Sequence, residues 1–174
     1  MNLKYELTKE DYLAFNLHYI KHSATVRKML FMQRFPMPVI FLAVPFALWI
    51  TTGEFPIELF LGFLLLSAAW VVFYPKFFYW YTMRNVNRAL NEGDNSNMLG
   101  PHEFHASEEG FIEKNQAEER KVNWSGIDRV EENEHYYFLF FNSVGAYIVP
   151  KRSFPDKSSE EEFKHVLRSA GLLS

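Results

Sequence analysis

Two apolar stretches, separated by a short break, constrain this sequence more than any other feature. Residues 35–52 carry no charged side chain, and residues 57–74 carry only Glu58, in their first turn. A helix of that length extends about 27 Å, close to the roughly 30 Å hydrocarbon thickness of a bilayer. The break at residues 53–57 is long enough only for a tight turn. The pattern therefore predicts a transmembrane helical hairpin, with Pro45 inside its first helix.

A hairpin buried inside a soluble protein is the alternative, but a chain of 174 residues offers little protein to cover two such stretches. Aromatic side chains crowd residues 73–81, which is typical of a bilayer boundary and less so of a ligand platform. No apolar segment lies in the first thirty or so residues, so no cleavable signal peptide is expected. Basic residues flank both stretches while the break has none, which predicts cytoplasmic termini; they are Arg27, Lys28, Arg34, Lys76, Arg84 and Arg88.

Charge is unevenly distributed along the chain. Residues 1–100 carry nine basic and seven acidic side chains, whereas residues 101–174 carry nine and fourteen. An acidic C-terminal part argues against a nucleic-acid partner, because that binding depends on cations that neutralise phosphates. It also argues against a polybasic reader of acidic lipids. The sequence has no cysteine, which excludes disulfides, thiolate catalysis and Cys-based metal sites.

The N-terminal region combines a strand pattern with a helix pattern. Residues 2–7 alternate polar and apolar side chains, which indicates a strand. Thr8 and Asp11 resemble a capping box that starts a helix over about residues 9–23. The strand is expected to pair with the C-terminal sheet, because an isolated strand would leave its backbone unpaired. His18 and His22 share one helix face and could chelate a metal, but no H-E-x-x-H pattern is complete, so no metal is expected.

Downstream of the hairpin, turn signals separate short strand patterns, and a helix follows them. The final helix is expected to start at a capping box of Ser158 and Glu161 and to end at Gly171. The predicted fold class is an α+β membrane protein with an antiparallel, pleckstrin-homology-like domain closed by a C-terminal helix. The strands are expected at residues 102–106, 110–114, 120–125, 127–131, 136–142 and 146–150, the linker at 91–100, and the parts as 1–34, 35–90 and 101–174.

Several segments resemble one bacterial family. The runs Trp124–Val130, Tyr136–Phe140 and Tyr147–Phe154, the acidic final helix and the opening Tyr5–Tyr12 are similar to YcxB-like proteins. This resemblance implies a bacterial inner- or plasma-membrane protein with two spans and a cytoplasmic domain. It implies no catalytic residues and no cofactor.

The candidate binding residues of the C-terminal part are Lys151, Arg152 and Trp124. The two cations could hold an anionic headgroup or an acidic segment of a partner, or pair internally with Asp156 or with the acids at 160–162. Trp124 alternates with Val122, which favours a core position over a ligand platform. No catalytic grouping is recognisable.

The leading hypothesis is a non-enzymatic interaction or regulatory protein in the lipid bilayer that docks a protein partner. Lipid or small-ligand binding at the membrane surface is the alternative, and an enzyme is a third hypothesis that needs a polar pocket. A homo-oligomer is left open.

Overall fold

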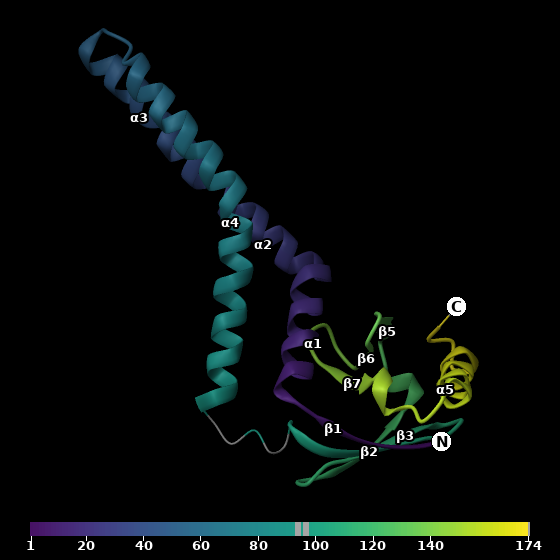
Figure 1. Cartoon of the computed structure of the whole chain (residues 1–174). Helices are drawn as coiled ribbons and strands as arrows, with labels where there is room; N and C mark the ends of the chain where they lie inside the picture. The colour runs from purple at the N-terminus through teal and green to yellow at the C-terminus, as the bar shows by residue number, and fades with distance from the viewer. Residues whose placement is uncertain (93–94, 96–97, 174) are drawn as a thin grey trace. The chain divides into compact units, whose positions relative to one another are not determined.

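The computed structural model describes residues 1–92, 95 and 98–173, which form two compact units. The first unit, here called the sheet domain, combines Met1–Asn16 with Ala89–Ser174. The second, here called the hairpin unit, is Leu17–Arg88. The N-terminal segment, purple in Figure 1, and the C-terminal segment, yellow, both belong to the sheet domain. Part of the predicted linker, residues 93–94 and 96–97, lies outside the described residues.

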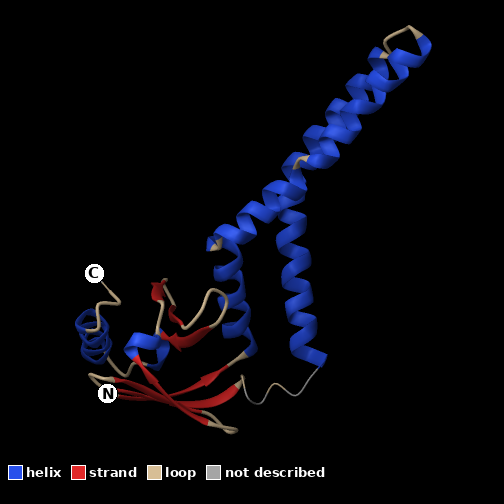
Figure 2. Cartoon of the chain, turned by 180° about the vertical axis from the view of Figure 1, so that it is seen from behind, coloured by secondary structure: helices blue, strands red, loops and turns tan. Residues whose placement is uncertain are grey.

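The hairpin unit is helical, and its turn is where the sequence predicts it. Helices α2 (Ala24–Arg34) and α3 (Pro36–Thr52) precede the turn, and α4 (Ile57–Glu92) follows it. Gly53 ends α3 in the left-handed conformation, with φ of 78°, and its N–H donates to the Trp49 carbonyl at 2.9 Å. α3 and α4 lie side by side in both Figure 1 and Figure 2.

Most of the apolar surface of this hairpin is left exposed by the residues that the structure describes. The segments Ala24–Thr52 and Ile57–Glu92 are long and apolar enough to cross a membrane. Only 11% and 6% of their most apolar windows are buried, respectively. A core helix of a soluble protein would be mostly buried, so this exposure is what a lipid-facing hairpin requires.

Both ends of the chain build the first sheet of the sheet domain. Strand β1 (Asn2–Leu7) pairs antiparallel with β2 (Gly100–Ala106), so that Leu3 lies opposite Phe104. This confirms the expectation that the N-terminal strand joins the C-terminal sheet. The order of this sheet is β1-β2-β3-β4, with β3 at Gly110–Lys114 and β4 at Glu119–Asn123.

The second sheet has the order β5-β6-β7, with strands Arg129–Glu132, Tyr136–Phe140 and Ala146–Pro150. Its central strand β6 is buried on both faces, as its continuous apolar run predicts. Tyr137 and Leu139 belong to the domain core, whereas Phe138 and Phe140 contact Phe15 of α1 (Lys9–His22), with ring centroids 5.5 and 5.9 Å apart. The start of α1 therefore covers the outer face of this sheet.

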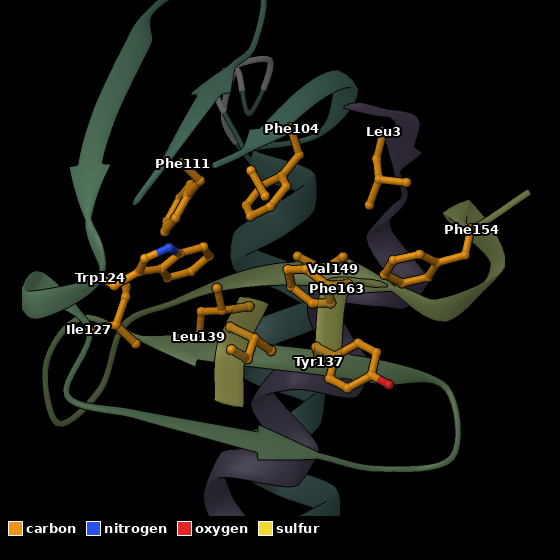
Figure 3. Close-up of a cluster of buried hydrophobic side chains, with 12 residues drawn as sticks. Leu3, Phe104, Phe111, Trp124, Ile127, Tyr137, Leu139, Val149, Phe154 and Phe163 are labelled. Atoms are coloured by element: carbon orange, nitrogen blue, oxygen red, sulfur yellow. The ribbon is translucent and has the colours of Figure 1, made fainter. Parts of the chain in front are cut away.

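The core lies between the two sheets and the C-terminal helix α5 (Lys157–Ser169). Figure 3 shows its side chains pointing toward one another from both sheets and from α5. Phe163 and Leu167 of α5 are fully buried, and the Phe163 ring meets Phe104 edge-on at 5.9 Å. An amphipathic helix that places two large apolar side chains on one face is expected to close such a sheet.

Four local predictions are wrong in detail. The strand expected at 136–142 ends at Phe140. The strand expected at 120–125 ends at Asn123, because Trp124–Gly126 forms a 3₁₀ turn that carries the tryptophan side chain into the core. The strand expected at 127–131 begins instead at Arg129. The N-cap of α5 is Asp156 rather than Ser158, since the Asp156 carboxylate accepts from the Ser159 N–H at 2.7 Å.

Candidate functional site

Trp124 lies in the core of the sheet domain. Its indole packs against Phe111, with ring centroids 5.2 Å apart, and its Nε1–H donates to the Ser107 carbonyl at 2.9 Å. The side chain is 5% exposed and its polar atom is satisfied, which is the usual state of a buried tryptophan. The position thus agrees with the core interpretation.

Lys151 begins the 3₁₀ turn η2 (Lys151–Ser153), which follows β7, and its ammonium group is held by carboxylates of the same domain. Its Nζ lies 2.5 Å from Glu132 and 3.8 Å from Glu160, and it sits over the Tyr137 ring at 4.8 Å. Glu160 belongs to the acidic run that the sequence offers as an internal partner. Binding of a partner or an anion by Lys151 stays a prediction.

Arg152 reaches the N-terminal segment of the chain. Its two terminal nitrogens donate to the two carboxylate oxygens of Asp11, each at 2.6 Å, and one of them also donates to the Glu6 carbonyl at 3.1 Å. Asp11 is 1% exposed and also accepts from the Tyr136 hydroxyl at 2.8 Å. Burial raises its pKa, but the hydrogen bonds from Arg152, Thr8 and Tyr136 outweigh burial and lower that pKa to about 2.

Asp11 is therefore more than a helix cap. It does form the predicted capping box, since the Thr8 N–H donates to its carboxylate at 2.8 Å and its own N–H donates to the Thr8 hydroxyl at 3.3 Å. The sequence gives no signal for its link to Arg152, because 141 positions separate the two residues. The internal partners expected for Arg152 from the sequence were Asp156 or the acids at 160–162. In the structure its partner is Asp11.

A second polar cluster, also missed from the sequence, lies on the inner face of the first sheet. His102 and Glu113 are buried, at 4% and 9% exposure, and Nδ1 of the imidazole lies 3.1 Å from Glu113 Oε1. The Tyr5 ring stacks parallel to His102 at 5.9 Å. Burial, and then the charge of Glu113, raise the pKa of Tyr5 well above its ordinary value.

The strand register explains how these residues meet. Tyr5 of β1 lies opposite His102 of β2, and Glu113 of β3 lies opposite Arg120 of β4. Side chains alternate between sheet faces, so all four share the face that carries Leu3, Phe104 and Phe111 at its other end. The alternation of Phe111 with Glu113 is the sequence signal that could have placed this carboxylate on the inner face.

The polar end of this sheet face opens into a groove of about 330 Å³ within the sheet domain. This volume is at the lower end of the range for small-molecule sites. His102 and Glu113 line the groove together with residues of β7, the β6–β7 loop and the start of α1. We call it the β4–β7 groove; it is lined by Leu7, Tyr12, Phe15, Met98, His102, Glu113, Asn115, Glu118, Arg120, Phe141, Val144, Gly145, Ala146, Tyr147 and Ile148.

The mouth of the β4–β7 groove is apolar and exposed. Met98, Phe141 and Val144 are 37%, 41% and 59% exposed, and within the described part of the sheet domain they are the large apolar side chains that are left exposed. All three line the groove. A gathering of exposed apolar side chains around a polar hollow is the usual mark of an interaction site.

His18 and His22 are neighbours, as their spacing predicts, with ring centroids 4.2 Å apart. His22 Nδ1 is engaged with the His18 carbonyl at 2.8 Å. Among the described residues, no group of three or more His, Cys, Asp or Glu side chains is arranged to hold a metal ion.

The fold and the groove define a class of protein: an apolar helical hairpin carrying a two-sheet α+β domain with a polar-floored hollow. Comparison with known families narrows this class, because residues 106–167 match the family of YcxB-like proteins. The resemblance predicted from the sequence is therefore confirmed over these residues, which run from the end of β2 into α5. Neither the curated proteins nor the solved structures include a match to this chain.

Proposed function

We propose that this chain is a membrane-anchored, non-enzymatic interaction protein whose sheet domain docks a protein partner. The observation that carries the anchoring is the exposed apolar surface of α3 and α4, which lipid would cover. Ile50 and Leu65 are 82% and 74% exposed in the hairpin unit, a state that is costly in water. From the two antiparallel sheets and the closing helix we infer a pleckstrin-homology-like scaffold, a fold suited to binding.

The proposed location is a bacterial inner or plasma membrane, with both termini in the cytoplasm. Basic side chains precede the first apolar stretch and follow the second, and the turn between α3 and α4 holds none. This asymmetry favours a turn on the far side of the membrane. The bacterial assignment rests on the resemblance to YcxB-like proteins.

The proposed docking surface is the apolar mouth of the β4–β7 groove. Lys151 and Arg152 are less suited to docking a partner, since Glu132 and Asp11 already accept their hydrogen bonds. Phe141 and Val144 sit in the β6–β7 loop, are 41% and 59% exposed, and offer apolar surface in place of hydrogen-bonding groups. A partner that covered them would remove apolar surface from water, which favours association.

Membrane anchoring is tested by extraction. The full chain should stay in the pellet when cell membranes are washed with alkaline carbonate, and should be released by detergent. Protease added to intact spheroplasts should leave the sheet domain uncut, and should cut it after the cells are opened. Release by carbonate would contradict the anchor, and cleavage in intact spheroplasts would contradict the orientation.

Docking is tested with a photoreactive amino acid placed at Val144. The full chain should form a defined cross-linked product in native membranes from this position. The same reagent at Glu108, an exposed residue outside the groove, is the matched control. Equal products from both positions would contradict a docking surface at the groove, and so would products from neither.

A further inference from the structure

The β4–β7 groove has an apolar rim, aromatic walls and a floor that offers hydrogen-bond acceptors. Tyr12 and Phe15 form one aromatic pair, with ring centroids 6.1 Å apart, and Phe141 and Tyr147 form another, at 5.2 Å. Aromatic faces attract cations and pack well against aliphatic chains. The walls therefore suit a group that has an apolar stem and a positively charged head.

Acidic groups outnumber basic ones in the groove. Glu113, Glu118 and Arg120 are its charged side chains apart from His102. Arg120 pairs with Glu118 at 2.5 Å, so these two charges offset each other at the solvent-exposed rim. Within the part of the chain that the structure describes, Glu113 is hydrogen-bonded to the imidazole of His102, which gives the groove an excess negative charge when that ring is neutral.

His102 adds a second acceptor to the floor. An ionised carboxylate can only accept, so beside an ionised Glu113 the proton of this hydrogen bond is carried by Nδ1. In the neutral ring Nε2 is then an acceptor, and this buried atom has no hydrogen-bond partner among the residues that the structure describes. A buried acceptor without a partner is unfavourable, so a donor that reached this atom would stabilise the site.

The exposed rim argues for a macromolecule over a small molecule. Met98, Phe141 and Val144 extend the apolar surface beyond the hollow itself, and a ligand confined to about 330 Å³ would leave much of it in water. The C-terminal part of the chain, with fourteen acidic and nine basic residues, also complements a basic partner over a longer range.

We propose that the β4–β7 groove receives a lysine or arginine side chain from a basic segment of the protein partner. The aliphatic stem lies against the aromatic walls, the charged head meets Glu113 and His102, and apolar neighbours in the segment cover Phe141 and Val144. This inference rests on the proposed docking function and names the chemistry of the partner for the same site.

The test uses the full chain in detergent micelles and a short fluorescent peptide. The peptide has a central lysine flanked by leucines, and two matched peptides carry norleucine or glutamate in place of the lysine. We expect fluorescence polarisation to show the lysine peptide binding about ten-fold or more tightly than both others, since charge-assisted hydrogen bonds are the strong ones. Added salt should weaken the binding of the lysine peptide more than that of the other two peptides. Equal binding of the three peptides, or preference for glutamate, would overturn the proposal.

Variants locate the peptide in the groove. Glu113→Gln keeps the shape of the side chain and should remove most of the preference for lysine, while Glu108→Gln, outside the groove, should leave it unchanged. Ala146→Trp narrows the groove without altering its charges and should weaken the binding of all three peptides. If Glu113→Gln is too unstable for the binding measurement, the proposal is still tested by Ala146→Trp and by the comparison of the three peptides on the unmodified chain. An unchanged lysine preference in Glu113→Gln, together with unchanged binding of all three peptides by Ala146→Trp, would overturn the site.

Failure of this inference is distinct from failure of the proposed function. Cross-linking from Val144 together with no preference for the lysine peptide would leave the docking proposal standing and would refute the basic segment. Absence of specific cross-linking together with a lysine preference that Glu113→Gln removes would support the groove chemistry and count against a protein as its natural source.

Discussion

Arg152 binds Asp11 through two hydrogen bonds of 2.6 Å, joining the end of β7 to the first turn of α1. The two side chains differ in their surroundings, because the aspartate side chain is 2% exposed and the arginine side chain is 51% exposed. This pair fixes the segment that leads from β1 into the helices against the sheet domain. Its asymmetry also determines which substitution is the more harmful.

Arg152→Ala should destabilise the sheet domain more than Asp11→Asn. Removing the arginine leaves a buried carboxylate that keeps only its neutral donors, which costs about 3 kcal/mol or more. Removing the charge of Asp11 leaves an arginine that can turn to water, so the cost is closer to about 2 kcal/mol. Thermal unfolding of the full chain in detergent, followed by the circular dichroism of the sheet domain, measures both.

The control for this comparison is Arg168→Ala, at an exposed ion pair of α5 whose atoms are 3.9 Å apart. Exposed pairs contribute about 0–1 kcal/mol, so this variant should change little. Equal destabilisation by Arg152→Ala and Arg168→Ala would contradict the role assigned to Asp11.

The Asp11 carboxylate also predicts a pH dependence. Its pKa falls from an ordinary value of 3.8 to about 2 in the folded chain, because the hydrogen bonds from Arg152, Thr8 and Tyr136 outweigh the opposing effect of burial. A lowered pKa means that its stabilising contribution is complete above the unfolded value and is lost as the pH falls toward the folded value. The difference in melting temperature between the unmodified chain and Asp11→Asn should be constant above about pH 5 and should shrink between about pH 4 and pH 2. A constant difference across that range would contradict the assignment.

Local patterns predicted most of the elements correctly. The alternation at residues 2–7 gives β1 with its observed bounds, and the apolar runs on either side of Gly53 give α3 and the start of α4. Each of these signals is contained in a few neighbouring residues. The final helix was also predicted, but its cap was misplaced, since Asp156 and Ser158 are both good N-cap residues and the sequence does not rank them.

The candidate site was much harder to predict, because it depends on register between distant strands. His102 and Glu113 lie on different strands and meet only when β2 and β3 pair as observed. The groove also needs the β6–β7 loop and the start of α1, which no local pattern brings together. Lys151 and Arg152 stood out in the sequence as adjacent cations, yet their acidic partners Glu132 and Asp11 are visible only in the fold.

The N-terminal strand should be required for the stability of the sheet domain. Leu3 is 2% exposed in the core and lies opposite Phe104, so Leu3→Ala creates a cavity that costs about 2–4 kcal/mol. Lys4, the next residue, faces solvent and pairs with Glu103 on the neighbouring strand. Lys4→Ala is therefore the matched control and should cost less than about 1 kcal/mol. Denaturant unfolding measures both, and equal effects of the two substitutions would contradict the position of β1.

Amide exchange gives an independent check on the same strand. The N–H groups of β1 that bond to β2 should exchange slowly in the full chain and rapidly in a peptide of residues 1–30. Equally fast exchange in both would show that β1 does not pair in solution.

Within the hairpin unit, Arg34 compensates for a proline of the neighbouring helix. Pro75 lies inside α4 and has no N–H, so the carbonyl four residues earlier, that of Val71, lacks its helical donor. Arg34 Nε donates to this carbonyl at 2.7 Å. In lipid such an unpaired carbonyl is expensive, and a donor from an adjacent helix is one of the ways in which membrane proteins tolerate proline.

A double-mutant cycle tests this compensation. Arg34→Ala should destabilise the hairpin by about 1 kcal/mol in the unmodified chain, because it leaves the Val71 carbonyl without a donor. Pro75→Ala restores the backbone N–H, so Arg34→Ala should then cost much less, and the interaction energy of the two sites should be of the order of 0.5–1 kcal/mol. Unfolding of the hairpin in mixed detergent micelles, followed by tryptophan fluorescence, measures the four variants. Additive effects would mean that Arg34 does not serve the carbonyl freed by Pro75. The end of α2 would then be held beside α4 by the neighbouring hydrogen bond, 2.8 Å long, that the Tyr74 hydroxyl donates to the Gln33 side chain.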